Sequence, residues 1–195
     1  MKQLLILLLS LIPSSCVSFT WRQDYYSHSQ GAYINGIEYH MTGYGLIGGR
    51  TNFDDFYVGG RDSLLLVAGR HRNGGMSSDP NGEQQYRFDF LIITDTVSFY
   101  KGAEFSFFDQ GGKLADYEYQ FSRVQEPYTG PKELVMATVY DLSGKKLFRA
   151  KEGIFVLYNI LQPEMERYVR SVRFEFIAES NDGEVLIVEK GYINQ

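Results

Sequence analysis

The sequence contains a single cysteine, Cys16, among 195 residues. One thiol excludes an intramolecular disulfide and a zinc site built from several cysteines. Positive charge is also scarce, because 19 Lys and Arg stand against 24 Asp and Glu and leave a net charge of −5. Nucleic-acid binding needs a concentrated basic face, so the composition predicts no nucleic-acid partner.

The sequence signatures of common enzyme classes are missing as well. The sequence has no Gly-x-Ser-x-Gly elbow, P-loop or dinucleotide fingerprint. The only histidines are His28, His40 and His71, and no two have the spacing of metal ligands on one element, so we expect no metal, cofactor or catalytic residue. Asp54 and Asp55 would point to opposite faces of a strand, so a glycoside hydrolase is only a minor alternative.

Aromatic residues are abundant by contrast. The chain has 14 Phe, 15 Tyr and 1 Trp, whereas charged residues make up 22%. Such a composition can bury enough apolar surface to offset the loss of chain entropy on folding, so disorder is not expected. The length suits one domain and is too short for two domains with separate cores.

Residues 1–15 have the layout of a secretion signal. Lys2 is followed by an apolar run from Leu4 to Leu9 and by the small pair Ser14-Ser15. This run is too short to span about 30 Å of hydrocarbon. Because Cys16 follows directly, the segment resembles bacterial lipoprotein signal peptides, which are cleaved just before a lipid-modified cysteine. The alternative is ordinary signal cleavage that leaves a free thiol.

The resemblance implies that Cys16 carries diacylglycerol and a further acyl chain, such as palmitate, and anchors the protein to a membrane. Later segments contain no apolar run of about 18 residues, so this lipid would be the only anchor. No acidic residue follows the cysteine in positions 17–20, which by Gram-negative sorting rules implies the periplasmic leaflet of the outer membrane. Exposure on the cell surface is the alternative, and residues 16–30 would be the tether.

From residue 31 onward, apolar and polar residues alternate in short segments, which is typical of antiparallel strands with one buried face. Val172, Phe174 and Phe176, for example, alternate with Arg173 and Glu175. Turn-forming residues separate the segments. These turns are Asn35-Gly36, Gln110-Gly111-Gly112, Ser143-Gly144 and Asn181-Asp182-Gly183. Residues 31–195 are therefore expected to form one β domain.

The expected fold is all-β, an antiparallel β-sandwich of about ten strands. A closed up-and-down β-barrel is the alternative, because either architecture requires one apolar face per strand. The expected strands include residues 64–68, 97–100, 114–121 and 154–160. One short helix is expected near 163–170, which begins with Pro163 and ends with Arg170.

Two stretches of the mature chain carry a further resemblance. Residues 31–39 contain an Asn-Gly turn flanked by Tyr33 and Tyr39, and residues 172–193 contain a Phe-x-Phe strand, an Asx-Gly turn and a final Gly-Tyr. Both stretches resemble the first and last hairpins of small uncharacterised β-rich lipoproteins of Bacteroidota. That group consists mainly of domains of unknown function, so the resemblance implies a fold but no activity.

The expected function is a non-catalytic binding or scaffold module of the cell envelope, with an envelope protein, glycan or lipid as partner. Candidates for ligand contact are Arg70, His71, Arg72 and Tyr128, because they combine positive charge with an aromatic ring in segments expected to be loops. The alternative is a carrier of a lipid or other apolar ligand inside a barrel. Residues expected to line its cavity are Phe88, Phe90, Tyr117, Tyr119 and Phe174.

Overall fold

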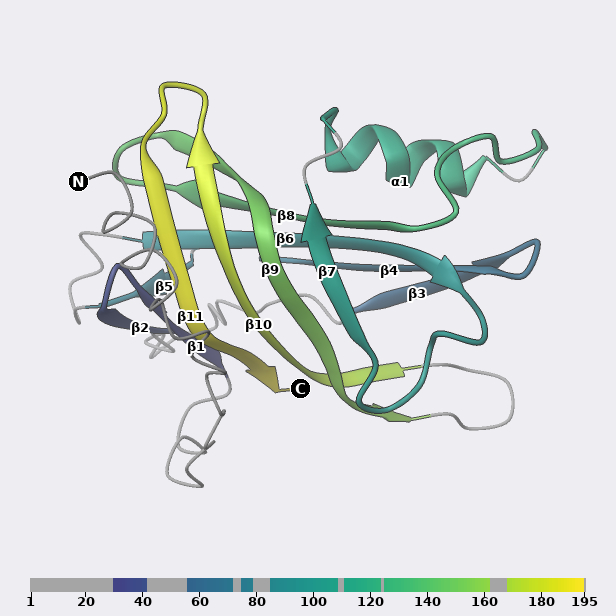
Figure 1. Cartoon of the computed structure of the whole chain (residues 1–195), viewed down its shortest axis with the longest axis horizontal. Coiled ribbons are helices and arrows are strands. Elements are labelled where there is room, and N and C mark those ends of the chain that lie inside the picture. Colours follow the sequence, from purple (N-terminus) through teal and green to yellow (C-terminus); the bar gives the residue numbers. More distant parts are fainter. Residues whose placement is uncertain are drawn as a thin grey trace, which may run out of the picture.

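A computed structural model describes residues 30–41, 56–71, 75–78, 85–108, 111–123, 125–161 and 168–194. Within these ranges the chain forms eleven strands and one helix (Figure 1). Every strand pairing is antiparallel, as the period-two alternation predicts. The all-β prediction is therefore confirmed.

Eight strands pair into a closed ring. They are β1 (Gln30–Ile34), β2 (Ile37–Met41), β5 (Met76–Ser77), β6 (Gln85–Asp95), β8 (Leu134–Asp141), β9 (Lys146–Leu161), β10 (Tyr168–Ser180) and β11 (Val185–Asn194). Around the ring the order is β6, β5, β2, β1, β11, β10, β9 and β8, and β8 pairs again with β6. The closed barrel, the second of the two expected architectures, is thus the observed one.

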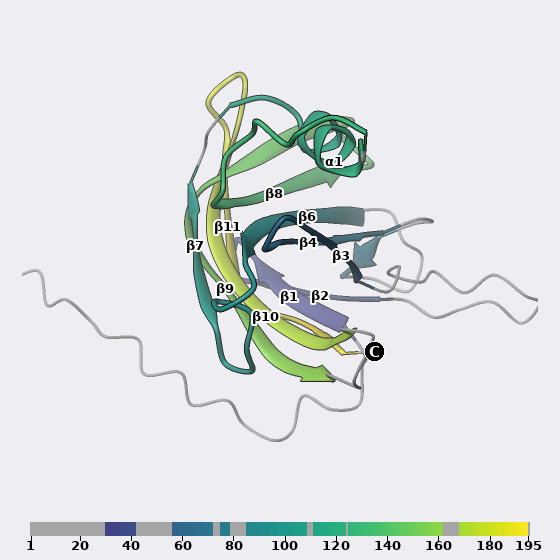
Figure 2. The same cartoon turned by 90° about the vertical axis from the view of Figure 1, so that its right-hand side faces the viewer.

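Three further strands extend the barrel on one side. β3 (Tyr57–Arg61) pairs with β4 (Leu64–Arg70), which pairs with residues 89–95 of β6, beyond the part of β6 that pairs with β5. β7 (Glu104–Phe108) pairs with β9 beyond the part that pairs with β8. The barrel consequently widens into two layers, with β3, β4, β6 and β8 in one and β7, β9, β10 and β11 in the other (Figure 2).

The hairpin turns follow the expected turn chemistry. Asn35 and Gly36 both have positive φ angles, 50° and 78°, as a two-residue hairpin requires. At the turn between β8 and β9, the Asp141 carboxylate accepts the N–H groups of Ser143 and Gly144 at 2.9 and 3.0 Å. These side-chain and backbone preferences set the registers of the β1–β2 and β8–β9 hairpins.

Phenylalanine rings fill the barrel between its two layers. Phe90 of β6 lies with its ring centroid 4.8 Å from that of Phe174 of β10 and 5.3 Å from that of Phe155 of β9. Phe88 lies 5.5 Å from Phe174, and all four side chains are buried. Each such aromatic pair contributes roughly 0.5–1.5 kcal/mol beyond the burial of its area. The inward orientation expected for Phe88, Phe90 and Phe174 is confirmed.

The strand expected at residues 114–121 is wrong, because Leu114–Ser122 forms helix α1. In a strand, Tyr117, Tyr119 and Phe121 would share one face. In the helix, Tyr117 and Phe121 lie one turn apart and face the sheet, whereas Tyr119 is 64% exposed. Tyr117 and Tyr119 therefore do not line the barrel interior, as the carrier alternative expected.

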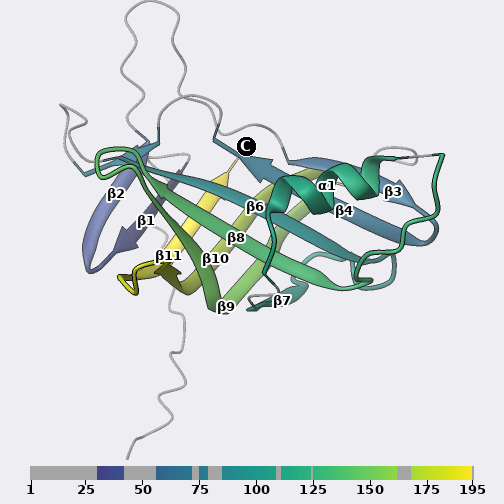
Figure 3. The ribbon, with the colours of Figure 1, turned by 90° about the horizontal axis from the view of Figure 1, so that it is seen from above.

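The position of α1 explains why this segment is helical. The outer face of β4, β6 and β8 is apolar and would be exposed to water without a covering element. Its buried side chains are Leu64, Leu66, Ala68, Leu91, Ile93, Leu134 and Met136, which pack with Phe121 of the helix. Figure 3 shows α1 lying across β4 and β6. A helix can cover three strands with one apolar face, which a single added strand cannot do.

Two other local predictions need correction. Residues 97–100 are not a strand, because the Asp95 carboxylate accepts the N–H of Ser98 at 2.6 Å and holds the chain in a turn. The helix expected near 163–170 is wrong at its end, because residues 168–170 begin β10. The rest of that segment, up to residue 167, lies outside the described ranges. The strand expected at residues 154–160 is confirmed as part of the much longer β9.

Candidate functional site

The outer face of the layer formed by β7, β9, β10 and β11 carries the candidate site. Alternation along β9 turns Phe155 and Leu157 inward, and they are fully buried. The same alternation turns Ile154, Val156 and Tyr158 outward, where none of them is fully buried. This layer therefore presents aliphatic side chains on both faces, and within the described part of the chain no helix covers its outer face as α1 covers the other layer.

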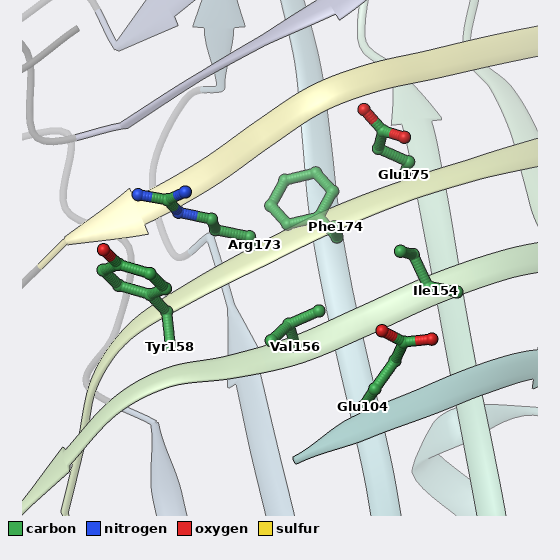
Figure 4. A pocket seen from close by; sticks show the side chains of 7 residues that line it. All are labelled: Glu104, Ile154, Val156, Tyr158, Arg173, Phe174 and Glu175. Atoms are coloured by element: carbon green, nitrogen blue, oxygen red, sulfur yellow. The ribbon is translucent and has the colours of Figure 1, made fainter. Parts of the chain in front are cut away.

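An open hollow of about 230 Å³ lies over β7, β9 and β10 (Figure 4). Its lining residues are Glu104, Ile154, Val156, Tyr158, Arg173, Phe174 and Glu175. In Figure 4, Ile154 and Val156 form the floor between Glu104 on one side and Glu175 on the other. The hollow thus combines an aliphatic floor with a carboxylate on each side.

A second hollow adjoins the first and shares Ile154 and Glu175 with it. It continues across β10 to β11, and its remaining lining residues are Glu152, Gly153, Phe176, Ile177, Ile187, Val188 and Glu189. We call the two hollows together the outer groove. The groove crosses four strands of one continuous sheet, so hydrogen-bonded backbone holds its walls in place.

Glu175 occupies an irregularity in the sheet at the centre of the groove. The β10–β11 register shifts between Phe174 and Phe176, and Lys190 on the opposite strand has a positive φ of 50°. This register shift is a β-bulge, and it leaves the backbone N–H of Lys190 without a partner in the β10–β11 hydrogen-bond ladder. The Glu175 carboxylate accepts that N–H at 2.9 Å instead. Burial raises the pKa of the Glu175 carboxyl, the Lys190 N–H opposes this, and neighbouring Glu189 raises the pKa further.

Arg173 and Tyr158 form one end of the groove. The Arg173 guanidinium carbon lies 3.7 Å from the centroid of the Tyr158 ring, in a cation–π contact. Tyr158 projects at an irregular point of β9, because the register shifts between Ser171 and Val172 of β10 and leaves no direct partner for Tyr158. This stack covers one face of the Tyr158 ring and closes that end with a positive charge.

Gly153 allows the strands beneath the groove to approach closely. Its φ is +138°, and a Cβ atom at this position would lie 2.1 Å from the backbone oxygen of Glu175 and 2.5 Å from the Cα of Phe176. A residue with a side chain would push β9 away from β10. The absence of a side chain at residue 153 therefore helps to hollow the groove where its two halves meet.

The described lining residues carry an excess of negative charge. Four are glutamates, at positions 104, 152, 175 and 189, and one is an arginine, at position 173. Carboxylates beside aliphatic side chains complement a ligand that pairs a positive charge with an apolar group. Neither a nucleophile with an adjoining base nor a histidine is found among these described residues.

Arg70, His71 and Tyr128, the described residues among those predicted to contact a ligand, lie outside the outer groove. Arg70, at the end of β4, forms an ion pair with Glu118 of α1 and stands opposite Asp89 of β6. Burial raises the pKa of the Asp89 carboxyl, and the positive charges of Arg87 and Arg70 oppose this. Arg72 and the lipidation candidate Cys16 lie outside the described residues. Ligand binding by Arg70 and Arg72 remains a prediction.

His71 and Tyr128 have structural contacts. His71 is buried, and its Nδ1 accepts the backbone N–H of Phe88 at 3.0 Å. Tyr128 packs edge-on against Phe121, 5.3 Å between ring centroids, and its hydroxyl donates to the backbone oxygen of Pro131 at 3.0 Å. His71 thus points away from the surface on which Arg70 lies, and Tyr128 helps to close the apolar cluster beneath α1.

Comparisons of the chain with protein-family models, curated proteins and solved structures gave no match. Within the described ranges, no helix has the length and hydropathy of a membrane span. In those same ranges, no three His, Cys, Asp or Glu side chains lie close enough together to hold a metal ion. Function is therefore inferred from the geometry and charge of the outer groove.

Sequence reasoning did not identify the outer groove. Its strands were expected, but a lining residue such as Glu104 and one such as Glu175 are 71 positions apart in the chain and meet only through strand pairing. One local signal was present. Residues 154–158 read Ile-Phe-Val-Leu-Tyr, so this strand is apolar on both faces, which is unusual for a strand with one face in water.

Proposed function

We propose that this protein is a non-catalytic binding module of the cell envelope and that the outer groove binds a polypeptide segment carrying basic and aliphatic side chains. The observation that carries this proposal is the placement of Glu104 and Glu175 on either side of the Ile154–Val156 floor. A lysine or arginine side chain fits such a place because its aliphatic stem contacts the floor while its charge meets a carboxylate.

The architecture supports binding rather than carriage of an apolar ligand inside the barrel. Three of the residues expected to line a carrier cavity, Phe88, Phe90 and Phe174, instead pack against one another. A lipid carrier needs an interior space of several hundred Å³, and closely packed rings occupy that space. Native mass spectrometry of the domain purified without detergent tests this alternative, and a co-purifying lipid would favour the carrier.

The proposal includes attachment to the envelope through a lipid on Cys16. Two or more acyl chains, at about 0.8 kcal/mol per buried methylene, hold a domain of this size stably at a bilayer. The proposed location is the outer membrane, with the domain in the periplasm and residues 16–30 as the tether. A tethered module can scan nearby envelope proteins for the segment it binds, because attachment raises their effective concentration.

The binding test uses the purified mature domain and a synthetic peptide of alternating Lys and Val, with affinity measured by calorimetry. Glu104→Gln and Glu175→Gln should each weaken binding roughly threefold to tenfold, and added salt should weaken it further. Glutamine at position 175 can still accept the Lys190 N–H, so the bulge is preserved. Glu179→Gln is the matched control, because Glu179 is an exposed glutamate of β10 outside the groove. Equal affinity of all four proteins would contradict the proposal.

A further inference from the structure

β7 is the last strand of its layer. Among the described strands it pairs only with β9, and its opposite edge has no strand partner. β8 pairs with residues 146–149 of β9 and β7 with residues 152–156, so the two strands follow one another along the same side of β9, and β8 lies close to β7 without pairing with it. In Figure 1, the end of β7 where Glu104 lies extends away from β8. Among the described strands, none therefore pairs with this edge of the layer that carries the outer groove, and we call it the open edge.

The backbone groups of β7 divide into two sets. Leu157 donates its N–H to the oxygen of Ala103 at 2.9 Å, and alternate residues of an antiparallel strand bond to the same neighbour. Phe105 and Phe107 consequently direct their N–H and C=O groups toward β9. Glu104, Ser106 and Phe108 direct theirs toward the open edge. These groups can bond to another extended chain.

The five residues of β7 lack several of the features that commonly prevent strand addition. Edge strands are commonly protected by lysine, proline, a bulge or a covering segment. The β7 sequence Glu-Phe-Ser-Phe-Phe contains neither lysine nor proline, and its register with β9 is regular over all five residues. Its outward side chains, Glu104 and Ser106, are exposed. Ser106 is small enough to allow a second strand to approach.

We propose that the partner segment binds as an added antiparallel β-strand on the open edge of β7. This inference rests on the proposed function, and it specifies the conformation of the ligand. A strand placed about 4.8 Å from β7 puts every second side chain on the outer face, beside Glu104 and within reach of the groove. Backbone hydrogen bonds to Glu104 and Ser106 supply affinity, and the Glu104 carboxylate selects lysine or arginine at the outward positions.

Strand register predicts that only every second residue of the partner exchanges backbone hydrogen bonds with β7. Paired residues of antiparallel strands place their side chains on the same face, so outward residues of the partner lie opposite Glu104 and Ser106. Those outward residues, the lysines of the alternating peptide, exchange the backbone hydrogen bonds with β7. The N–H groups of the valines point to the far side. Methylation of the peptide nitrogen at lysine should block the pairing, and methylation at valine should not.

The experiment compares two peptide isomers of equal mass and charge, one N-methylated at every lysine and the other at every valine. The lysine-methylated isomer should bind the mature domain at least about tenfold more weakly, because it loses several backbone hydrogen bonds. Ser106→Pro should weaken the valine-methylated isomer by a similar factor, because it removes an N–H that faces the open edge. Ser106→Thr keeps that N–H and is the matched control.

The outcomes separate this inference from the proposed function. If both isomers bind equally and Glu104→Gln weakens both, the groove binds a basic ligand but strand addition is wrong. If neither isomer nor the unmodified peptide binds, the proposed function fails together with the inference. If the protein alone sediments as a dimer that Ser106→Pro dissociates, the open edge belongs to a second copy, and the proposal of a separate partner is overturned. The peptide pair decides the question even if Ser106→Pro fails to fold.

Discussion

Nδ1 of the buried His71 ring accepts the backbone N–H of Phe88 at 3.0 Å, and the backbone N–H of His71 in turn donates to the oxygen of Phe88 at 3.1 Å. The ring must be neutral at Nδ1 to accept this bond. Burial lowers the pKa of His71 to about 4, the backbone oxygen of Phe88, 3.2 Å from Nδ1, opposes the shift, and the charge of Arg87 adds to it. The neutral form of the His71 ring is thus the form that bonds to the backbone of β6.

This coupling predicts that stability depends on pH. The unfolded chain binds a proton at His71 near pH 6.5 and the folded chain only near pH 4, so the free energy of unfolding falls as pH decreases through this window. The loss should be on the order of 3 kcal/mol, measured by urea denaturation at a series of pH values. His71→Gln keeps an acceptor but cannot titrate, so its unfolding free energy should fall less. Identical pH profiles for the two proteins would contradict the prediction.

Gly153→Ala should destabilise the protein by roughly 3 kcal/mol. The substitution forces a side chain into a positive φ and against the backbone of β10, which combines strain with overpacking. Gly60→Ala is the control, because the nearest atom to a Cβ there is a Leu65 side-chain carbon at an ordinary 3.7 Å. Thermal denaturation compares the two variants, and similar melting temperatures would show that β9 and β10 can separate without cost.

Phe121→Ala and Tyr119→Ala distinguish the helix from the strand that the local sequence pattern predicts. In α1, Phe121 is 5% exposed and Tyr119 is 64% exposed. Phe121→Ala should therefore reduce the free energy of unfolding by about 3 kcal/mol or more, whereas Tyr119→Ala should change it by less than about 0.5 kcal/mol. In a strand the two rings would share a face, so equal losses in chemical denaturation would contradict the helix.

Cys16→Ser should release the protein from the membrane fraction. The mature N-terminus of the unaltered protein should carry the added mass of a diacylglycerol and an acyl chain, and the variant should lack it. Membrane fractionation followed by mass spectrometry measures both results. Retention of Cys16→Ser in the membrane at an unmodified mass would mean that another part of the chain provides the attachment.

Local sequence determined the parts of the fold that depend on one strand or one turn. Period-two alternation predicted the inward faces of Phe88, Phe90 and Phe174, and Asn35-Gly36 predicted the first hairpin turn. These predictions hold because side-chain alternation and positive φ are properties of a few consecutive residues. The same reasoning limited the architecture to a sandwich or a barrel, since either one buries a single face of each strand.

Tertiary structure decided everything that depends on pairing between distant segments. The ring closes because β8 pairs with both β6 and β9, which no local pattern encodes. The segment Leu114–Ser122 is helical because it covers the apolar outer face of β4, β6 and β8, so the demand for burial overrides its alternating aromatics. Glu104 and Glu175 likewise share a groove only through the register of three neighbouring strands, and side-chain alternation alone contains no information on register.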